Sequence, residues 1–365
     1  MKLKSLLYPM LAATLTALSS GHVKSTDAND PAIDQILIRA GFTGTALVAE
    51  QGVILHHQGY GFAVKEWAIE NRPSTRFRIA SLSKNFTATL IMMLVEEGKI
   101  NLDKPLKTYL PNYKADYAGT VTVKHLLQHR SGISRQFKIP GWKTGKSVSP
   151  ISKEQFLTMI AGMPLEFKPD SKRHYSSANY FILGAIIETV TGKDFGTVLK
   201  EKILIPLNMK DSDIFRTGQV VPNLARAYKH VNGQYSFCPP VSGDYCIGGA
   251  VNFALFHASG SMHATATDLL KWDQALYGSN LLNKESKAFL FSPKTHAVWN
   301  VMDISLTEGQ TTKIMIADGG LEGYKSIMVR FPNEKRSIIL LNNTGISHSH
   351  MLQTVQMIAL AMFEK

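Results

Sequence analysis

The sequence contains little cysteine, and what it has comes late. Of 365 residues only Cys238 and Cys246 are cysteines. Because no cysteine precedes position 238, the N-terminus offers no attachment point for a lipoprotein anchor. No histidine or cysteine cluster accompanies the pair, so a zinc site is not indicated. Proline and glycine in the intervening CPPVSGDYC favour a turning loop. In an oxidising compartment this loop could close through a disulfide, and two free buried thiols are the alternative.

No apolar run is long enough for a membrane-spanning helix, which needs about 20 residues. Residues 351–363 are apolar over only 13 positions, which suits a packed helix. At the other end, Lys2 and Lys4 precede an apolar run over residues 6–18 and then small residues. This order predicts a secretory signal peptide over residues 1–20, with an N-terminal anchor as the alternative. We expect a periplasmic or secreted monomer with no membrane span after cleavage.

Acidic residues are scarce relative to basic ones, 28 against 40, which gives a formal charge of +12. Loss of Lys2 and Lys4 with the signal would lower this by 2, to +10. A basic exported protein is attracted to anionic surfaces such as cell-wall polymers. A merely solvated surface is the alternative. No basic stripe interleaved with aromatic residues occurs, so we expect no nucleic-acid partner.

The chain also lacks internal repeats, low-complexity tracts and a Pro/Gly/Ser linker, which favours interleaved lobes over domains in series. Strand-rich runs with turn signals lie at residues 43–63 and 324–345, and mostly helical patterns lie between them. The predicted fold class is therefore α+β, with an antiparallel sheet built from N- and C-terminal strands. We predict one domain over residues 28–365, with a helical lobe inserted at approximately 85–260.

Several helices are predicted from apolar spacing and from start and stop signals. The first has Asp30 as N-cap, Pro31 at its first position and Gly41 as terminator. The others are predicted at residues 82–97, 123–129, 153–161, 179–190, 266–277 and 350–363.

One short stretch, FRIASLSKNFTATL, places Ser81 and Lys84 three positions apart at the start of a helix. That spacing puts both side chains on one side. A nucleophilic serine needs a base at contact distance, and its backbone N–H at a helix start can stabilise an oxyanion. By itself S-x-x-K is a weak signal, and a helix cap followed by a surface lysine is the alternative.

Taken with its neighbours, this stretch resembles the serine β-lactamase and penicillin-binding-protein family, in the branch of class C β-lactamases, D-alanyl-D-alanine carboxypeptidases and esterases. Collinear segments support the resemblance from about residue 30 to 360: residues 77–111, VTVKHLLQHRSGIS (121–134), YSSANYFILGAIIETVTGKDF (175–195), ILIPLNMKDSDI (203–214), ASGSMHATATDLLKW (258–272) and GGLEGYKSIMVRFP (319–332).

The resemblance implies an acyl-enzyme mechanism without metal or organic cofactor. Ser81 would attack a carbonyl, Lys84 would share the proton, and Tyr175 would act as second base and acid. Backbone N–H groups of Ser81 and Leu321 would hold the oxyanion. His129 in HRSG would shape the loop beside the pocket.

Two positions depart from the family pattern. Ser177 stands where the Y-x-N motif has asparagine, and Asp318-Gly319-Gly320 stands where many relatives have Lys-Thr-Gly or His-x-Gly. We expect Asp318 to repel a substrate carboxylate. An ester, an amide without a free carboxylate or a substrate with an amino group would then suit the site better.

These observations predict an exported serine hydrolase that acts on an ester or a peptide-like amide, of esterase or D-amino-acid peptidase type. Wall-directed carboxypeptidase activity and class C-like β-lactamase activity are alternatives within the family. An alternative of another class is a weakly active or non-catalytic module that binds the cell wall.

Overall fold

A computed structural model describes residues 28–146, 149–216, 219–231, 234–237, 255–295, 297–307, 310–321 and 323–364. The predicted signal peptide and both cysteines lie outside these residues, so the signal and the disulfide stay predictions. The limits 28–365 for one domain and 85–260 for the helical lobe also stay predictions.

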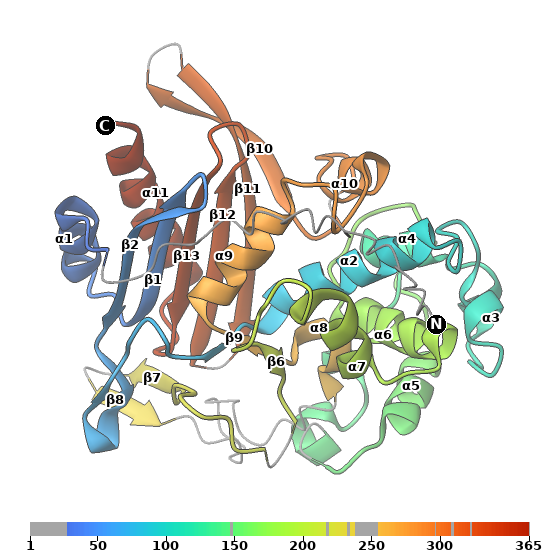
Figure 1. Cartoon of the computed structure of the whole chain (residues 1–365). Coiled ribbons are helices and arrows are strands. Elements are labelled where there is room, and N and C mark those ends of the chain that lie inside the picture. Colours follow the sequence, from blue (N-terminus) through green and yellow to red (C-terminus); the bar gives the residue numbers. More distant parts are fainter. Residues whose placement is uncertain are drawn as a thin grey trace, which may run out of the picture.

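A six-stranded antiparallel sheet forms one side of the molecule (Figure 1). Its order is β10-β11-β12-β13-β1-β2. Strand β1 from the N-terminal part pairs with β13 from the C-terminal part, and Leu47 lies opposite Ile339. The sheet strands are β1 Gly44–Glu50, β2 Val53–Tyr60, β10 Asn300–Thr307, β11 Gln310–Leu321, β12 Tyr324–Phe331 and β13 Arg336–Asn342. This arrangement confirms the predicted α+β class and the sheet built from both chain ends.

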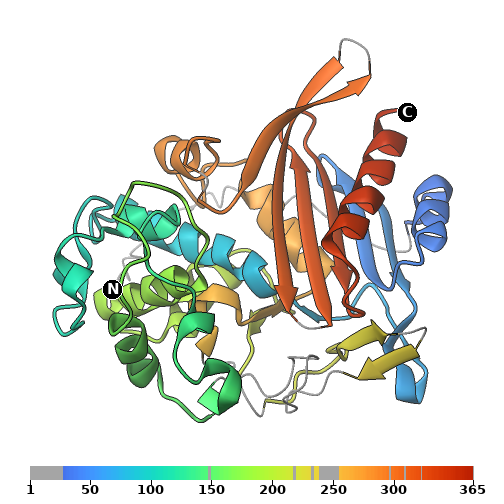
Figure 2. The same ribbon diagram turned by 180° about the vertical axis from the view of Figure 1, so that it is seen from behind.

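Helices α1 (Pro31–Arg39) and α11 (His348–Phe363) cover one face of the sheet (Figures 1 and 2). The Asp30 side chain accepts hydrogen bonds from the N–H groups of Ala32 and Ile33, which fixes the start of α1 as predicted. Ile33 and Leu37 of α1 are buried against apolar side chains of the sheet. Sequence thus determines both where this helix begins and which side faces the sheet.

The other face of the sheet packs against α9 (Ala266–Ala275) through a buried ion pair. Arg330 of β12 donates from Nε to Asp273 of α9, and both side chains are almost fully buried. The Ser337 hydroxyl donates to the second carboxylate oxygen of Asp273 at 2.6 Å. The Arg330 guanidinium also lies 4.5 Å from the ring centre of Tyr277. Each charge is therefore compensated within the interface.

A helical region follows β5 (Phe77–Arg78) and lies beside the sheet (Figure 1). Its long members are α2 and α6, which are buried along most of their length and contact each other. Gly192 ends α6 with φ 67°, as predicted. The helices are α2 Ser83–Glu96, α3 Leu106–Tyr109, α4 Val123–Leu127, α5 Lys153–Ala161, α6 Ser177–Thr191, α7 Phe195–Leu199, α8 His257–Gly260 and α10 Lys284–Leu290.

Short strands and helical turns connect these parts. Strand β9 pairs with both β5 and β6 and so holds the start of α2 against the helical region. The short strands are β3 Phe62–Val64, β4 Ile69–Glu70, β6 Asp213–Ile214, β7 Tyr228–Val231, β8 Gln234–Phe237 and β9 Met262–Ala264. The turns are η1 Lys65–Trp67, η2 Ala80–Leu82, η3 Asp116–Gly119, η4 Gln136–Lys138, η5 Trp142–Lys146 and η6 Lys200–Leu204.

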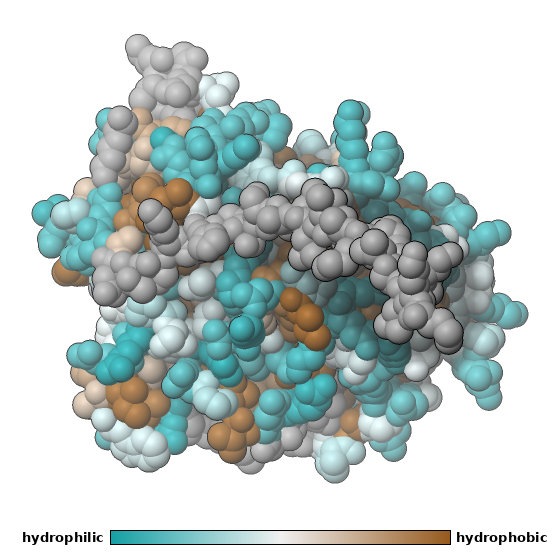
Figure 3. Space-filling view, viewed as in Figure 1, coloured by the Kyte–Doolittle hydropathy of each residue, from teal (hydrophilic) through white to brown (hydrophobic). Residues whose placement is uncertain are grey.

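On the face seen in Figure 3, apolar side chains occur in separate groups among hydrophilic ones. Exposed large apolar residues such as Val53 and Trp67 belong to the sheet edge and to η1. In the described part of the chain, no helix combines the length and the apolarity needed to cross a membrane.

We predict that Asp273→Ala lowers the free energy of unfolding by about 3–5 kcal/mol, because it leaves the Arg330 charge buried without its partner. Denaturant unfolding measures the loss. The matched control is Asp303→Ala, which removes an exposed partner of Lys313 and should cost less than about 1 kcal/mol. Equal, small losses in both variants would contradict a supporting role for the buried pair.

Candidate active site

Ser81 lies in the turn η2, directly before α2. The preceding residue, Ala80, has φ 49°, a left-handed conformation that costs a non-glycine residue about 1–3 kcal/mol. Ser83 stabilises the turn, since its hydroxyl donates to the Ala80 carbonyl at 2.7 Å and accepts from the Met262 N–H at 3.2 Å. Ala80 and Leu82 are buried on either side, and both Ala80 and Ser81 line the neighbouring cavity.

Lys84 follows Ser81 after one turn of chain and is only 3% exposed. Its ammonium donates to Ser81 Oγ at 3.0 Å and to the Ser259 carbonyl of α8 at 2.5 Å. The ring centres of Tyr175 and Tyr180 lie 5.1 and 5.8 Å from Nζ. Among the described residues no carboxylate forms an ion pair with Lys84, so neutral oxygens and aromatic rings compensate its charge.

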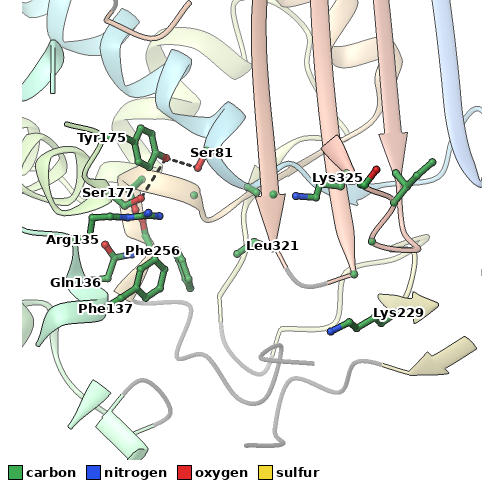
Figure 4. Close-up of a pocket in the computed structure, with 18 of the residues that line it drawn as sticks. Ser81, Arg135, Gln136, Phe137, Tyr175, Ser177, Lys229, Phe256, Leu321 and Lys325 are labelled. Carbon is green, nitrogen blue, oxygen red and sulfur yellow. Dashed lines mark hydrogen bonds between the residues drawn. The ribbon is translucent and has the colours of Figure 1, made fainter. Parts of the chain in front are cut away.

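Tyr175 reaches the same point from the loop before α6, and its hydroxyl lies 2.7 Å from Ser81 Oγ (Figure 4). Burial alone raises the pKa of Tyr175, but the Lys84 charge and hydrogen bonds from Lys84, Ser177 and Ser81 outweigh it. The net pKa lies below the usual value. When Tyr175 is ionised, its oxygen can only accept, so the Ser81 hydroxyl donates to it while Lys84 donates to Ser81 Oγ. The phenol oxygen is then placed to accept the serine proton.

Three nearby residues support Tyr175 or its loop. The His129 ring packs 4.6 Å from the Tyr175 ring, and its Nδ1 accepts the Ser176 N–H at 3.3 Å. Burial lowers the pKa of His129 well below its usual value, so the ring is neutral. The Ser177 hydroxyl lies 3.4 Å from the Tyr175 hydroxyl. His174 is half exposed, and its Nδ1 lies 2.8 Å from Glu166.

The end of β11 lies against the turn that carries Ser81. A Cβ on Gly319 would lie 2.2 Å from the Ile79 carbonyl oxygen and 3.0 Å from the Leu82 nitrogen. Only glycine allows this approach. Leu321, two residues on, lines the cavity with Ser81, which is where the sequence predicts the second oxyanion N–H.

Asp318 is absent from the described lining of the cavity beside Ser81. Side chains alternate along a strand, so with Gly319 on the Ser81 side, Asp318 faces the side covered by α11. There its carboxylate is 3.8 Å from His348, and it does not line the cavity. Asp318 is not among the described residues that line the cavity, and the expectation that it repels a substrate carboxylate stays a prediction.

A cavity of about 470 Å³ opens in front of Ser81, between the sheet and the helical region (Figure 4). Its walls include Tyr175, Ser177, Gly320 and Leu321, so most of the predicted site residues come together. The charged side chains among its described lining residues are all cationic: Arg135, Lys229 and Lys325. An anionic group is thus favoured over a cationic one in this cavity.

No cluster of three or more His, Cys, Asp or Glu that could hold a metal ion occurs among the described residues. The arrangement offers instead a hydroxyl with a proton acceptor at 2.7 Å and an ammonium at 3.0 Å. Such a group can attack a carbonyl carbon by nucleophilic catalysis.

Comparison with known proteins decides the family. The sequence pattern of the family described as Beta-lactamase matches residues 30–361. The chain belongs to this family. The family resemblance inferred from the sequence is thereby confirmed.

Two named relatives and one solved structure are similar to this chain over much of its length. Penicillin-binding protein 4* of Bacillus subtilis is 27% identical, covering 83% of this chain and 68% of that protein. Teichoic acid D-alanine hydrolase of Staphylococcus aureus is 28% identical, covering 74% of this chain and 61% of the hydrolase. The D-amino acid amidase of Ochrobactrum anthropi SV3 has the same fold, with a TM-score of 0.74, 24% identity and coverage of 91% and 98% of the two chains.

Three residues of this site were not predicted from the sequence. Ser259 binds Lys84 through its carbonyl, and Arg135 and Lys325 line the cavity. Ser259 and Lys325 lie inside segments that carry the family resemblance. Their roles depend on a backbone carbonyl and on a contact between strands, which residue type alone does not reveal.

We predict that Tyr175 ionises below the value of about 10 usual for tyrosine, because the Lys84 charge stabilises the phenolate. Any rate that needs the phenolate should rise with pH and level off below pH 10. Ultraviolet titration of the wild type minus Tyr175→Phe isolates this group. Burial raises the pKa of six other tyrosines, so these do not ionise in the pH range below 10 where Tyr175 is titrated. They are Tyr60, Tyr113, Tyr117, Tyr180, Tyr228 and Tyr277.

In Lys84→Met the Tyr175 transition should move to higher pH. A transition that stays in place would show that Lys84 does not set the ionisation of Tyr175.

Gly319→Ala should cost about 1–3 kcal/mol of stability and at least about tenfold in activity, because the new methyl pushes the Ser81 turn away from β11. Thermal melting and ester turnover measure both effects. Gly119→Ala is the matched control, since its Cβ meets nothing within 4 Å. If both variants behave alike, the close approach at Gly319 does not constrain the site.

Proposed function

We propose that the protein is a serine hydrolase that cleaves an ester or a peptide-like amide through an acyl-enzyme on Ser81. The contact of Ser81 with both Lys84 and Tyr175 carries this proposal. Lys84 stabilises the phenolate of Tyr175, and this phenolate takes the serine proton as Ser81 attacks the carbonyl and becomes a neutral phenol. Tyr175 then returns a proton to the leaving group and later activates the water that releases the acyl group.

The oxyanion formed in each step is stabilised by the backbone N–H groups of Ser81 and Leu321. The positions of Ser81 and Leu321 support this assignment, because both residues line the cavity and η2 packs against β11. Ser177 contributes a hydroxyl beside Tyr175 where many relatives have an amide.

The names of the similar proteins support the substrate class. One acts on D-alanine of teichoic acid and another on D-amino acid amides. Esterase or D-amino-acid peptidase activity therefore leads, and wall-directed carboxypeptidase activity comes second. We place the protein in the periplasm or outside the cell, where its positive charge would hold it near anionic cell-wall polymer.

β-Lactam hydrolysis is the third candidate activity. The cationic lining of the cavity favours it, because penicillins carry a carboxylate. A non-catalytic wall-binding module is less favoured, since the contacts among Ser81, Lys84 and Tyr175 are all in place.

We predict that the wild type forms a covalent adduct with a fluorophosphonate, a p-nitrophenyl ester or a fluorescent penicillin, and that Ser81→Ala forms none. Intact-mass spectrometry measures the adduct, and peptide mapping places it. Ser171→Ala, at an exposed serine, is the matched control and should label fully. The lifetime of the penicillin adduct separates a β-lactamase from a penicillin-binding protein.

Tyr175→Phe should slow turnover by about 10²–10⁴-fold, since one proton carrier is lost. Equal labelling of wild type and Ser81→Ala, or no labelling by any reagent, would overturn the proposed function and favour the binding module.

A further inference from the structure

The third family motif has lost its positive charge in this chain. Asp318 stands at the position of the lysine or histidine of many relatives, and its carboxylate lies 3.8 Å from His348, outside the described lining of the cavity. A cation nevertheless stands at this wall, on another strand. Lys325 of β12 lies opposite Gly320 in the sheet register and lines the cavity with it.

The backbone explains how Lys325 reaches the cavity. A Cβ on Gly320 would lie 2.7 Å from Lys325 Nζ, so the ammonium occupies space that any other residue at position 320 would take. Figure 4 shows the Lys325 side chain running toward the Ser81 side of the cavity. No described carboxylate forms an ion pair with it.

The surroundings of Lys325 add to the positive potential. The cavity wall continues through Gly345, Ile346 and Ser347, where α11 begins. Ser347 caps this helix of 16 residues, and its first turn carries no acidic residue. The helix start adds a partial positive charge on the same side as Lys325, and the Asp318 carboxylate, 3.8 Å from His348 in the first turn, offsets part of it.

We propose that Lys325 is the specificity residue of the cavity and selects an acyl substrate with an anionic group, a carboxylate or a phosphate. The anionic group lies between the ammonium of Lys325 and the start of α11, while the scissile carbonyl faces Ser81. This assignment rests on the proposed hydrolase function and deepens it. It also reverses the preference expected from Asp318, because the charge that meets the substrate belongs to β12.

The test compares matched p-nitrophenyl esters. One is the half-ester of succinate, and the other is its methyl-capped neutral form. In a second pair of esters, the carboxylate of the anionic member is on the leaving group. In a third pair, the anionic member carries a phosphate in place of the carboxylate. The quantity measured is the ratio of kcat/KM for the anionic over the neutral member, so a general loss of catalysis cancels.

Lys325→Met should lower this ratio about 10- to 100-fold for at least one pair, because a charge-assisted contact is lost. Gly320→Ala should lower it as well, since the new methyl displaces the flexible end of Lys325 without touching backbone. The pair that responds identifies carboxylate or phosphate as the group and shows which side of the ester bears it.

Two control variants keep the result specific. Lys107→Met removes an equal charge from the exposed surface of α3 and should leave the ratio unchanged. Asp318→Asn should not lower the ratio, since that carboxylate repels an anion if it acts at all.

An unchanged ratio for every pair in folded Lys325→Met and Gly320→Ala would overturn the role of Lys325, while turnover of both esters would leave the hydrolase function standing. If the wild type cleaves neither ester and Ser81 is not labelled, the function itself fails and this assignment with it. Circular dichroism melting of each variant confirms folding.

Discussion

One buried positive charge organises the site. The Lys84 ammonium is almost fully enclosed, yet no described carboxylate pairs with it, and a buried charge without compensation is costly. The structure compensates it with the Ser259 carbonyl, the Ser81 hydroxyl and two aromatic rings. The phenol of Tyr175, which can become an anion, has its ring centre 5.1 Å from the Lys84 ammonium. One interaction therefore has two effects. When Tyr175 loses its proton, the phenolate compensates the buried Lys84 charge, and the Lys84 charge in turn stabilises Tyr175 as a base.

The short distance between η2 and β11 is the second constraint. It brings the predicted oxyanion donors together, and it leaves no room for a Cβ at position 319. Because side chains alternate along the strand, a glycine that faces the serine turn sends Asp318 to the opposite face. A glycine at position 320 then opens a path for Lys325 from the neighbouring strand. The departures from the family motif are thus linked, since one glycine fits the turn and the next admits a cation.

The frame that holds these groups uses different interactions from the site. The sheet is fixed to α9 by the enclosed pair of Arg330 and Asp273, in which every charge has a polar partner. On the opposite face, apolar packing of α1 and α11 does the same work. This rigid support lets the site keep a strained Ala80 and an unpaired ammonium.

The sequence by itself determined the family, the sheet built from both chain ends, the limits of α1 and α5, and the pairing of Ser81 with Lys84. All of these depend on local signals: caps, apolar spacing, strand-and-turn patterns and two residues one turn apart. The tertiary structure decided which charges face the substrate. Tyr175 comes from 94 residues away, Lys325 crosses between strands, and Asp318 turns outward. No local signal fixes these three, because each depends on the face or the neighbour that a strand or loop meets only after folding.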